Sequence, residues 1–263
     1  MTEVVELRQR ILEENINLHK IEAKFYDRIH PEEFNFFEQG RIQRDLKFIR
    51  SNLQDDPEIL DLGCGTGNLL LKLLKLNCSV LGVDISTDMV EVLKAKVAEE
   101  TKGRAKLLVQ NIDDFILGCG QRFDCLVTSS VLHHLPDYIQ TLERALKLLK
   151  PGGWLYITHE PTKGALDADP FLRKILWQLD NLIFNILFGA RIPVLKGRNF
   201  HLSDYQLYHG FDEEKVIQRC LESGVKIIKL QKYASAMRLG FFCWFDSEVI
   251  KSKRQFSLIG KKL

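Results

Sequence analysis

The chain has 263 residues, an apolar fraction of 45% and a formal net charge of +2, with basic and acidic residues nearly balanced. This composition supplies an ordinary globular core and lacks the basic excess of nucleic-acid-binding proteins, so no nucleic-acid partner is expected. The six cysteines form no C-x-x-C pair, which argues against a zinc site and a disulfide framework. Together with the lack of a signal peptide and of any apolar run of about 18 residues, this predicts a cytoplasmic protein without a transmembrane segment.

In chain order, the first 50 residues are polar, with apolar residues at helical spacing, and we expect a helical N-terminal cap over residues 1–52. Between residues 56 and 160, short apolar runs alternate with helical patterns, which predicts a parallel sheet with helices on both faces. We expect strands at 58–62, 79–84, 105–110, 123–129 and 153–159, and helices at 67–76, 87–101 and 137–149.

Residues 161–211 break this alternation and are expected to form a helical insertion on the substrate side of the sheet. Apolar residues at i, i+3, i+4 and i+7 predict one helix over 172–187 with an apolar face. Three roles stay open for this helix: a core helix, a pocket wall or lid, or a contact with a membrane surface or a second copy. Its polar residues, which include Lys174 and Asp180, are too mixed in charge to argue for anionic lipid.

The regular pattern resumes with a helix at 212–223 and strands at 225–231 and 255–260, which suit an antiparallel final hairpin. The predicted fold is therefore α/β, with a doubly wound seven-stranded sheet that is mostly parallel and has an antiparallel final strand. Residues 53–263 are expected to form this domain, with 161–211 inserted after the fifth strand.

The first predicted strand runs into three glycines at alternate positions, Gly63, Gly65 and Gly67. Without a Cβ, glycine allows positive φ and close approach to a ligand, and the N–H groups at the following helix start favour a carboxylate or phosphate. Asp84 ends the second predicted strand, where its carboxylate can accept hydrogen bonds from both hydroxyls of a ribose. The pattern predicts a cofactor site at this edge of the sheet.

Two classes of cofactor fit such a turn. The dinucleotide fingerprint G-x-G-x-x-G needs glycine at its sixth position, where this sequence has Asn68. The spacing of Asp61 and the three glycines instead resembles motif I of the class I methyltransferases that use S-adenosylmethionine. The resemblance covers residues 55–160 well and 212–262 loosely. It implies a Rossmann-like fold, S-adenosylmethionine as cofactor and S-adenosylhomocysteine as product.

The resemblance also implies which residues bind the cofactor. Asn111 aligns with an aspartate that holds the adenine amino group in the family, and Asp113 is the alternative if the register differs. Ser129 would lie beside the methionine part, and Tyr26 resembles a tyrosine that folds over the cofactor, with helix packing as its alternative role. Arg41 is expected on a solvated helix face, with pairing to the cofactor carboxylate as the alternative. The expected cofactor contacts are Tyr26, Asp61, Gly63, Cys64, Gly65, Gly67, Asp84, Ile85, Asn111, Ile112, Asp113 and Ser129.

Methyl transfer needs little from the protein besides alignment and exclusion of water, because a sulfonium methyl group is already electrophilic. A general base is needed only if the acceptor must lose a proton, and the candidates are His133, His159 and Glu160, with His201 from the insertion. His134 is more simply a helix-start or packing residue. No metal is expected, because the side chains of two adjacent histidines diverge and no acidic i+4 partner completes a metalloprotease pattern.

The cap and the insertion are rich in Leu, Ile, Phe and Trp, which predicts a mostly apolar pocket. We expect a small or lipid-like acceptor, O- or C-methylation rather than N-methylation, and substrate contacts from His133, His201 and Tyr205. Peripheral membrane contact is left open, as is the choice between a monomer and a homodimer. The alternatives are an NAD-binding oxidoreductase, which Asn68 opposes, and a non-catalytic relative that keeps the cofactor site as a partner module.

Overall fold

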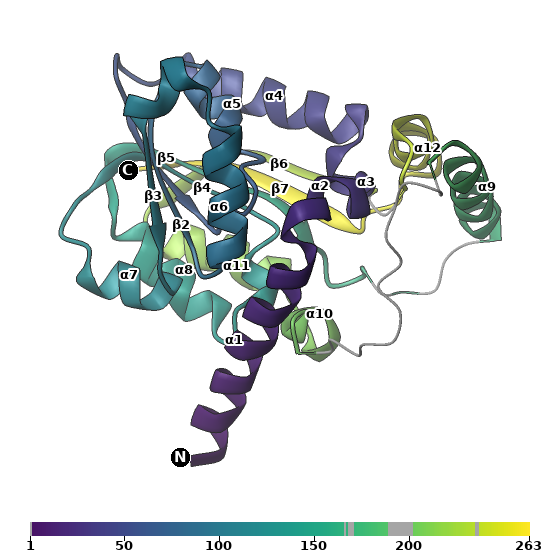
Figure 1. The fold of residues 1–263 in the computed structure, drawn as a ribbon, viewed down its shortest axis with the longest axis horizontal. Coiled ribbons are helices and arrows are strands. Elements are labelled where there is room, and N and C mark those ends of the chain that lie inside the picture. Colours follow the sequence, from purple (N-terminus) through teal and green to yellow (C-terminus); the bar gives the residue numbers. More distant parts are fainter. Residues whose placement is uncertain (1, 166, 168–170, 189–201, 235–236) are drawn as a thin grey trace.

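A seven-stranded sheet runs through the centre of the computed structural model, which describes residues 2–165, 167, 171–188, 202–234 and 237–263 (Figure 1). The strand order is β3-β2-β1-β4-β5-β7-β6, and β7 runs antiparallel to both neighbours while the other pairs are parallel. This confirms the predicted fold class. The strands are β1 (Glu58–Leu62), β2 (Ser79–Asp84), β3 (Ala105–Val109), β4 (Phe123–Ser129), β5 (Leu149–Pro161), β6 (Val225–Tyr233) and β7 (Gln255–Lys262).

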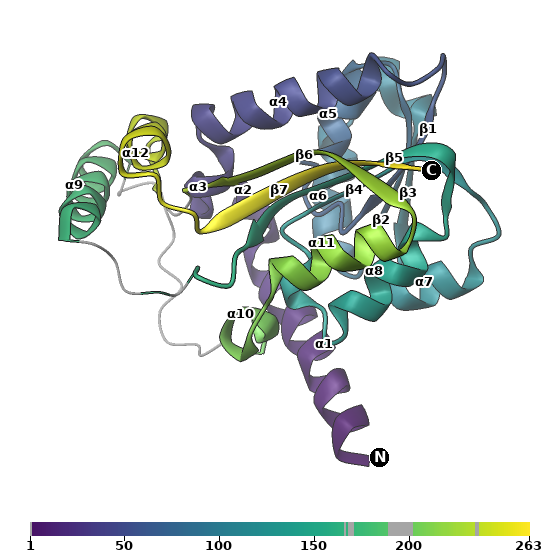
Figure 2. The same cartoon turned by 180° about the vertical axis from the view of Figure 1, so that it is seen from behind.

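Helices cover both faces of the sheet, as Figures 1 and 2 show from opposite sides. Neighbouring residues of β1 divide between the two faces because side chains alternate along a strand: Ile59 joins one buried cluster and Leu60 the other. Both faces of the sheet are therefore buried, which explains why the strand sequences are continuous apolar runs. One face carries α4 (Phe36–Arg50), α5 (Leu70–Lys75) and α6 (Thr87–Lys96), and the other α7 (Ile112–Gly118), α8 (Tyr138–Leu146) and α11 (Glu213–Glu222).

Three helices precede α4: α1 (Thr2–Glu22), α2 (Tyr26–Ile29) and α3 (Pro31–Phe34). Asp27 of α2 connects these helices to the glycine turn and to α6. Its carboxylate accepts hydrogen bonds from Thr66 Oγ1 of the turn at 2.6 Å and from Lys96 Nζ of α6 at 2.6 Å. The cap is therefore fixed beside the carboxyl ends of β1 and β2. The division into residues 1–52 and 53–263 stays a prediction.

The segment after β5 and the connection between the last two strands hold further helices. They are α9 (Phe171–Phe188), α10 (Tyr205–His209), α12 (Gly240–Phe245) and a π-helix (Asp246–Ile250). Helix α9 lies beside α12 (Figures 1 and 2), and its Leu176 packs against Met237 and Cys243. Within the described residues, no helix combines the length and apolarity that crossing a membrane requires.

Of the three roles left open for α9, that of a core helix does not fit the structure. Its buried residues are Arg173, Leu176, Asp180 and Phe184, whereas most of its apolar face is exposed. Helical periodicity shows which side of a helix is apolar, but only tertiary structure shows which side is covered.

Smaller differences concern helices that are too short to show a period. The sequence pattern did not indicate α7, α10 or α12, and the helix expected over 87–101 ends at Lys96, with a 3₁₀ segment at Glu99–Arg104. The strand expected at 153–159 runs from Leu149 to Pro161.

Candidate functional site

The glycine turn after β1 bends because its glycines take positive φ, +48° at Gly65 and +97° at Gly67. A Cβ on Gly67 would lie 2.4 Å from Leu93 Cδ1, so this glycine is required by packing against α6. A Cβ on Gly65 would meet nothing within 4 Å, so its backbone borders open space. A ligand in that space can therefore contact the backbone of Gly65 directly.

Asp84, at the end of β2, holds the turn in place. Its Oδ2 accepts a hydrogen bond from the Gly65 N–H at 2.8 Å, and its Oδ1 accepts one from the Ser86 N–H at 2.8 Å. Each carboxylate oxygen keeps a second lone pair that a ligand hydroxyl can use.

Asp61 lies on the neighbouring strand and is almost completely buried. Its Oδ2 has no hydrogen-bond partner among the described residues. Burial, and then the negative charge of Asp84, raise the pKa of Asp61 to about 8. Two desolvated carboxyl groups side by side favour a positively charged ligand, which would stabilise both in their ionised form.

The glycine turn, the ends of β1, β2 and β4, and the cap enclose one pocket, which we call the turn pocket. It receives ten of the twelve predicted cofactor residues: Tyr26, Asp61, Gly63, Cys64, Gly65, Asp84, Ile85, Asn111, Ile112 and Ser129.

The two remaining residues, Gly67 and Asp113, do not line the turn pocket. Asp113 accepts a hydrogen bond from Thr141 Oγ1 of α8 at 2.7 Å, so the alternative in which Asp113 holds adenine is not supported. Asn111 lines the pocket, but its Oδ1 caps α7 by accepting from the N–H groups of Asp113 at 2.8 Å and Asp114 at 3.4 Å. The oxygen expected to meet the adenine amino group is thus already used in helix capping.

A second pocket adjoins the first, and we call it the ionisable pocket. Its lining includes five histidines, together with carboxylates from α1, α3 and the segment before α10, so it holds more ionisable groups than the sequence indicated. The two pockets share His19, Tyr26, Glu33, Ser130 and His134. The histidines are His19, His30, His133, His134 and His159.

His133 and Glu160 form a buried pair at the end of the sheet. His133 Nδ1 lies 2.8 Å from Glu160 Oε2, and the same carboxylate accepts hydrogen bonds from the N–H groups of Val131 at 2.7 Å and Leu132 at 2.8 Å. Burial lowers the pKa of His133, but the hydrogen bond and charge of Glu160 outweigh it, so the pKa lies above its ordinary value. With its oxygens occupied in this way, Glu160 is placed to orient the imidazole, and its role as a base stays a prediction.

Two residues beside this pair hold a left-handed backbone, Ser130 with φ +58° and His159 with φ +55°. Such a conformation costs a non-glycine residue about 1–3 kcal/mol and is concentrated at functional sites. At His159 it accompanies a shift in the pairing of β5 with β7 between Ile157 and Glu160. A bulge of this kind re-aims the side chains that follow it, and Glu160 is the first paired residue beyond the shift.

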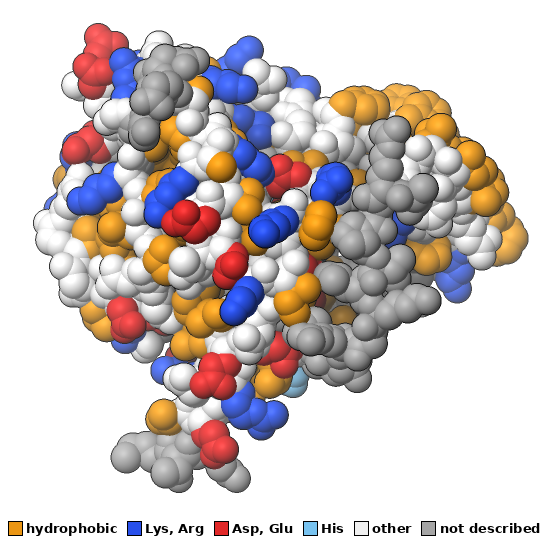
Figure 3. Space-filling view, in the orientation of Figure 1, with side chains coloured by type: hydrophobic (Ala, Val, Ile, Leu, Met, Phe, Trp, Pro, Cys, Tyr) orange, Lys and Arg blue, Asp and Glu red, His pale blue; other side chains and the backbone are white. Residues whose placement is uncertain are grey.

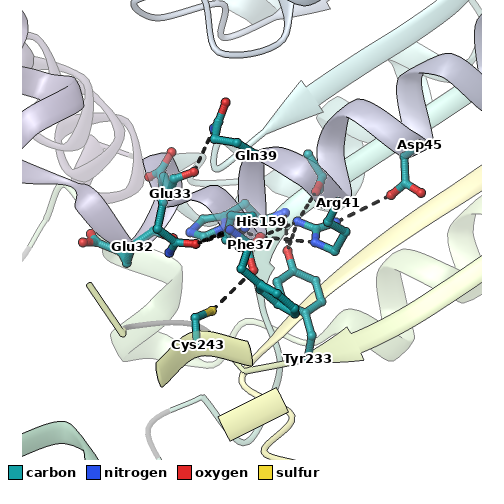
Figure 4. Close-up of polar contacts among 12 residues, drawn as sticks. Glu32, Glu33, Phe37, Gln39, Arg41, Asp45, His159, Tyr233 and Cys243 are labelled. Atoms are coloured by element: carbon teal, nitrogen blue, oxygen red, sulfur yellow. Dashed lines mark hydrogen bonds and ion pairs between the residues drawn. The ribbon is translucent and has the colours of Figure 1, made fainter. Parts of the chain in front are cut away.

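His159 itself is largely enclosed and belongs to a buried network (Figure 4). Its Nδ1 lies 3.8 Å from Glu38 Oε2, and its backbone N–H donates to the hydroxyl of Tyr233 at 3.2 Å. Burial lowers the pKa of His159, but the charges of Glu33 and Glu38 raise it above its ordinary value. His159 thus serves the structure more than it faces an acceptor.

Arg41 is the centre of that network, so the solvated helix face expected for it is wrong, and it does not line the turn pocket. It is 5% exposed, and its Nη2 donates to Glu38 Oε2 at 2.7 Å, to the Tyr233 hydroxyl at 2.6 Å and to Thr158 Oγ1 at 3.0 Å (Figure 4). The guanidinium also stacks 4.0 Å from the centre of the Tyr233 ring. Arg41 therefore fastens α4 to the edge of the sheet beneath the ionisable pocket.

His133 and His134 do not diverge as expected, because their ring centres lie 4.1 Å apart. Together with Asp204 they place three potential metal-ligand atoms within 4.8 Å of one another. His134 Nδ1, however, is 2.5 Å from the Ser203 carbonyl oxygen, so that nitrogen is engaged as a hydrogen-bond donor. Burial, and then the charges of His133 and His19, lower the pKa of His134 well below its ordinary value.

The predicted substrate contacts had mixed outcomes. His133 lines the ionisable pocket, whereas His201 lies outside the described residues. Tyr205 lines neither pocket and stacks on His209 with ring centres 4.1 Å apart. The sequence analysis missed His19 and His30 because both come from polar helices of the cap and no local pattern marks them.

Comparison with known proteins agrees with this geometry. Residues 60–155 match a family model described as a methyltransferase domain, a segment that holds the glycine turn, Asp84 and most of the parallel strands. Over this segment the chain is therefore similar to a methyltransferase domain, which together with the fold supports a class I methyltransferase that uses S-adenosylmethionine.

Curated relatives match the same region. The chain is 32% identical over 114 residues to a ubiquinone biosynthesis O-methyltransferase of Coxiella burnetii, covering 43% of this chain and 48% of the relative. It is 37% identical over 98 residues to a demethylmenaquinone methyltransferase of Lactococcus lactis, covering 36% of this chain and 38% of the relative. The matched segments thus span less than half the length of these relatives.

Among solved structures, the fold is similar to magnesium protoporphyrin IX methyltransferase from Synechocystis PCC 6803 with bound S-adenosylhomocysteine. The TM-score is 0.58 at 15% identity, with 95% of this chain and 100% of the other covered. At this identity the likeness shows the fold alone.

Proposed function

We propose that the turn pocket binds S-adenosylmethionine. Asp84 would accept hydrogen bonds from the ribose hydroxyls while it holds the Gly65 N–H. The sulfonium and ammonium charges of the cofactor suit a pocket that contains the two buried carboxyl groups of Asp61 and Asp84. Asp61 Oδ2 and Ser129 Oγ are buried without a described partner, so a ligand amino group would satisfy them.

We further propose that the chain methylates a hydroxyl oxygen, with His133 as general base. Glu160 fixes the Nδ1 proton of His133, which leaves Nε2 with a lone pair toward the ionisable pocket. The hydroxyl proton passes to Nε2, the oxygen forms a bond to the methyl carbon, and the carbon–sulfur bond breaks to give S-adenosylhomocysteine. The His133–Glu160 pair is the observation that carries this proposal, because N-methylation of a free amine would not require an oriented base.

The acceptor we propose is a small molecule with an ionisable hydroxyl on its head and an apolar remainder. Histidines and carboxylates line the pocket around His133, which suits a polar head group. The names of the two quinone-related relatives support the same class. The matches cover 43% and 36% of this chain, so the acceptor specificity is proposed from this chain's own residues.

The test has two parts. Calorimetric titration of the purified chain with S-adenosylmethionine and with NAD should show binding of the first alone, because Asn68 occupies the position of the third glycine and bonds to Gln39 and Lys72. Labelled methyl transfer should then be measured with phenolic, quinol and amine acceptors. Binding of NAD alone would refute the cofactor proposal, and transfer only to amines would refute the role of His133. Binding without transfer to any acceptor would favour a non-catalytic relative.

A further inference from the structure

Most residues of helix α9 fall in three sectors around its axis, and the three others, Trp177, Leu187 and Phe188, are exposed apolar residues outside the apolar sector. At about 100° per residue, Arg173, Leu176, Asp180 and Phe184 form one sector, and all four are buried. A second sector of about 120° is entirely apolar and exposed: it holds Phe171, Leu172, Ile175, Leu179, Leu182, Ile183 and Ile186. The third sector is polar: it holds Lys174, Gln178, Asn181 and Asn185.

The charged groups of the buried sector fasten α9 to the rest of the molecule. Arg173 Nε donates to Asp246 Oδ2 at 2.8 Å, with both side chains buried. The Asp180 carboxylate accepts from the backbone N–H groups of Arg238 at 2.8 Å and Leu239 at 2.8 Å, just before α12. Since removing one partner of a buried ion pair costs about 3–5 kcal/mol, these contacts fix which side of the helix faces inward.

The apolar sector consequently faces outward. Phe171 is 79% exposed and Ile186 is 73% exposed, and Figure 3 shows hydrophobic side chains gathered along the outer edge of the molecule where α9 and α12 lie. Phe241 and Trp244 of α12 are also exposed. We call this surface, made by the apolar sector of α9 with Phe241 and Trp244, the outer apolar face. Contiguous apolar surface of this kind marks a site of interaction.

Its chemistry favours lipid over a protein partner. A standard protein interface carries roughly ten hydrogen bonds, but the apolar sector of α9 contains no polar side chain. Asp180, which made the charge of α9 look mixed in the sequence, is buried, so Lys174 is the one charged side chain that α9 and α12 expose. An apolar sector bordered by a polar sector with a cation and no anion is the pattern of a helix lying in a membrane interface.

We propose that α9 docks this chain on the surface of a lipid bilayer, with its outer apolar face in the acyl boundary and its polar sector toward the head groups. The same helix lies at the rim of the ionisable pocket, which Arg173 and Trp177 line. A groove lined by Phe36, Phe184, Phe188 and Phe241 runs beside it and shares Phe34 with the turn pocket. These lining residues of α9 lie on the side of the helix opposite its apolar sector, so docking would place α9 between the bilayer and the pocket and groove. The docking itself does not depend on the proposed methyl transfer.

The test is sedimentation of the purified chain with vesicles of phosphatidylcholine, alone and mixed with phosphatidylglycerol. A double variant, Leu182→Glu with Ile186→Glu, places two charges in the apolar sector at exposed positions that contribute little to folding. Its matched control, Gln178→Glu with Asn185→Glu, adds the same charge to the polar sector of the same helix. We expect the wild type and the control to bind phosphatidylcholine vesicles, and the apolar-sector variant to bind at least about tenfold more weakly.

Equal binding by the two double variants, or no binding of the wild type to either vesicle, would overturn the proposal. Sedimentation velocity tests whether a second copy of the chain covers this face instead of lipid. A wild type that is a dimer and does not bind vesicles, with only the apolar-sector variant dissociating to a monomer, would show that it does. Thermal melting of each variant checks that the fold is kept. Cofactor titration checks that the turn pocket is intact, so a failed methyl-transfer proposal would leave the vesicle result unaffected.

Discussion

The turn pocket and the ionisable pocket share a wall but are built in different ways. Most of the first comes from short segments at the carboxyl ends of adjacent strands, and backbone groups such as the Gly65 N–H are part of it. The second gathers side chains from α1, the segment after β4, the end of β5 and the residues before α10. A short sequence pattern can specify the first kind of site, whereas the second exists only when the whole chain has folded.

The two pockets also differ in charge balance. In the turn pocket, burial and then the negative charge of Asp84 raise the pKa of Asp61 to about 8. In the ionisable pocket, carboxylates face histidines, and the pKa of His30 rises to about 10 because hydrogen bonds from Glu22 and Glu32 outweigh its burial. The turn pocket therefore favours a positively charged ligand, whereas in the ionisable pocket the charges of the carboxylates and the histidines offset one another.

The largest expected effect separates the two pockets functionally. His133→Ala should lower turnover by about 10²–10⁴-fold because it removes the proposed base, and it should leave the affinity for S-adenosylmethionine unchanged. Steady-state kinetics and calorimetry measure the two quantities on the same preparation. A parallel loss of cofactor affinity would mean that the pockets cannot be treated as separate sites.

Glu160→Gln should lower turnover by less than His133→Ala, because the imidazole remains. Without the negative charge of Glu160, burial dominates and the pKa of His133 falls, so the acid limb of the pH–rate profile should move to lower pH. In the wild type, activity should appear as the pH rises through the elevated pKa of His133, since the base must be neutral. A profile that does not move would assign Glu160 a purely structural role.

In the turn pocket, Asp84→Ala should weaken S-adenosylmethionine binding by about 1.5–3 kcal/mol, the scale of hydrogen bonds to a charged group. Glu91→Ala, which removes an exposed carboxylate nearby on α6, is the matched control and should change little. Unchanged affinity in Asp84→Ala would remove the ribose assignment.

The smallest effect is a pH dependence of cofactor binding. In the free protein Asp61 is protonated below about pH 8, and a bound cation favours its ionised form, so binding releases a proton. Affinity should therefore rise with pH, by at most tenfold per unit, and level off above about 8. Titrations in buffers of different ionisation enthalpy would detect the proton, and Asp61→Asn should flatten the dependence.

The same contrast explains what the sequence could predict. Asp61, the glycines and Asp84 could be identified because the turn and the strand ends are local and the chemistry depends on spacing. The bulge at His159 and the burial of Arg41 depend on partners far along the chain, and so does the inward side of α9. Periodicity predicted that helix and its apolar face, but it left open what the face contacts.

The link between the cap and the glycine turn has a kinetic consequence. Thr66 and Lys96 both bond to Asp27, and Tyr26, its neighbour, lines both pockets. Spent cofactor must leave a space that the cap helps to enclose, so each round of catalysis includes parting these contacts and making them again. Their strength thus sets how long the product resides, and ionic strength, which weakens the half-exposed Lys96–Asp27 pair, becomes a control on the speed of exchange.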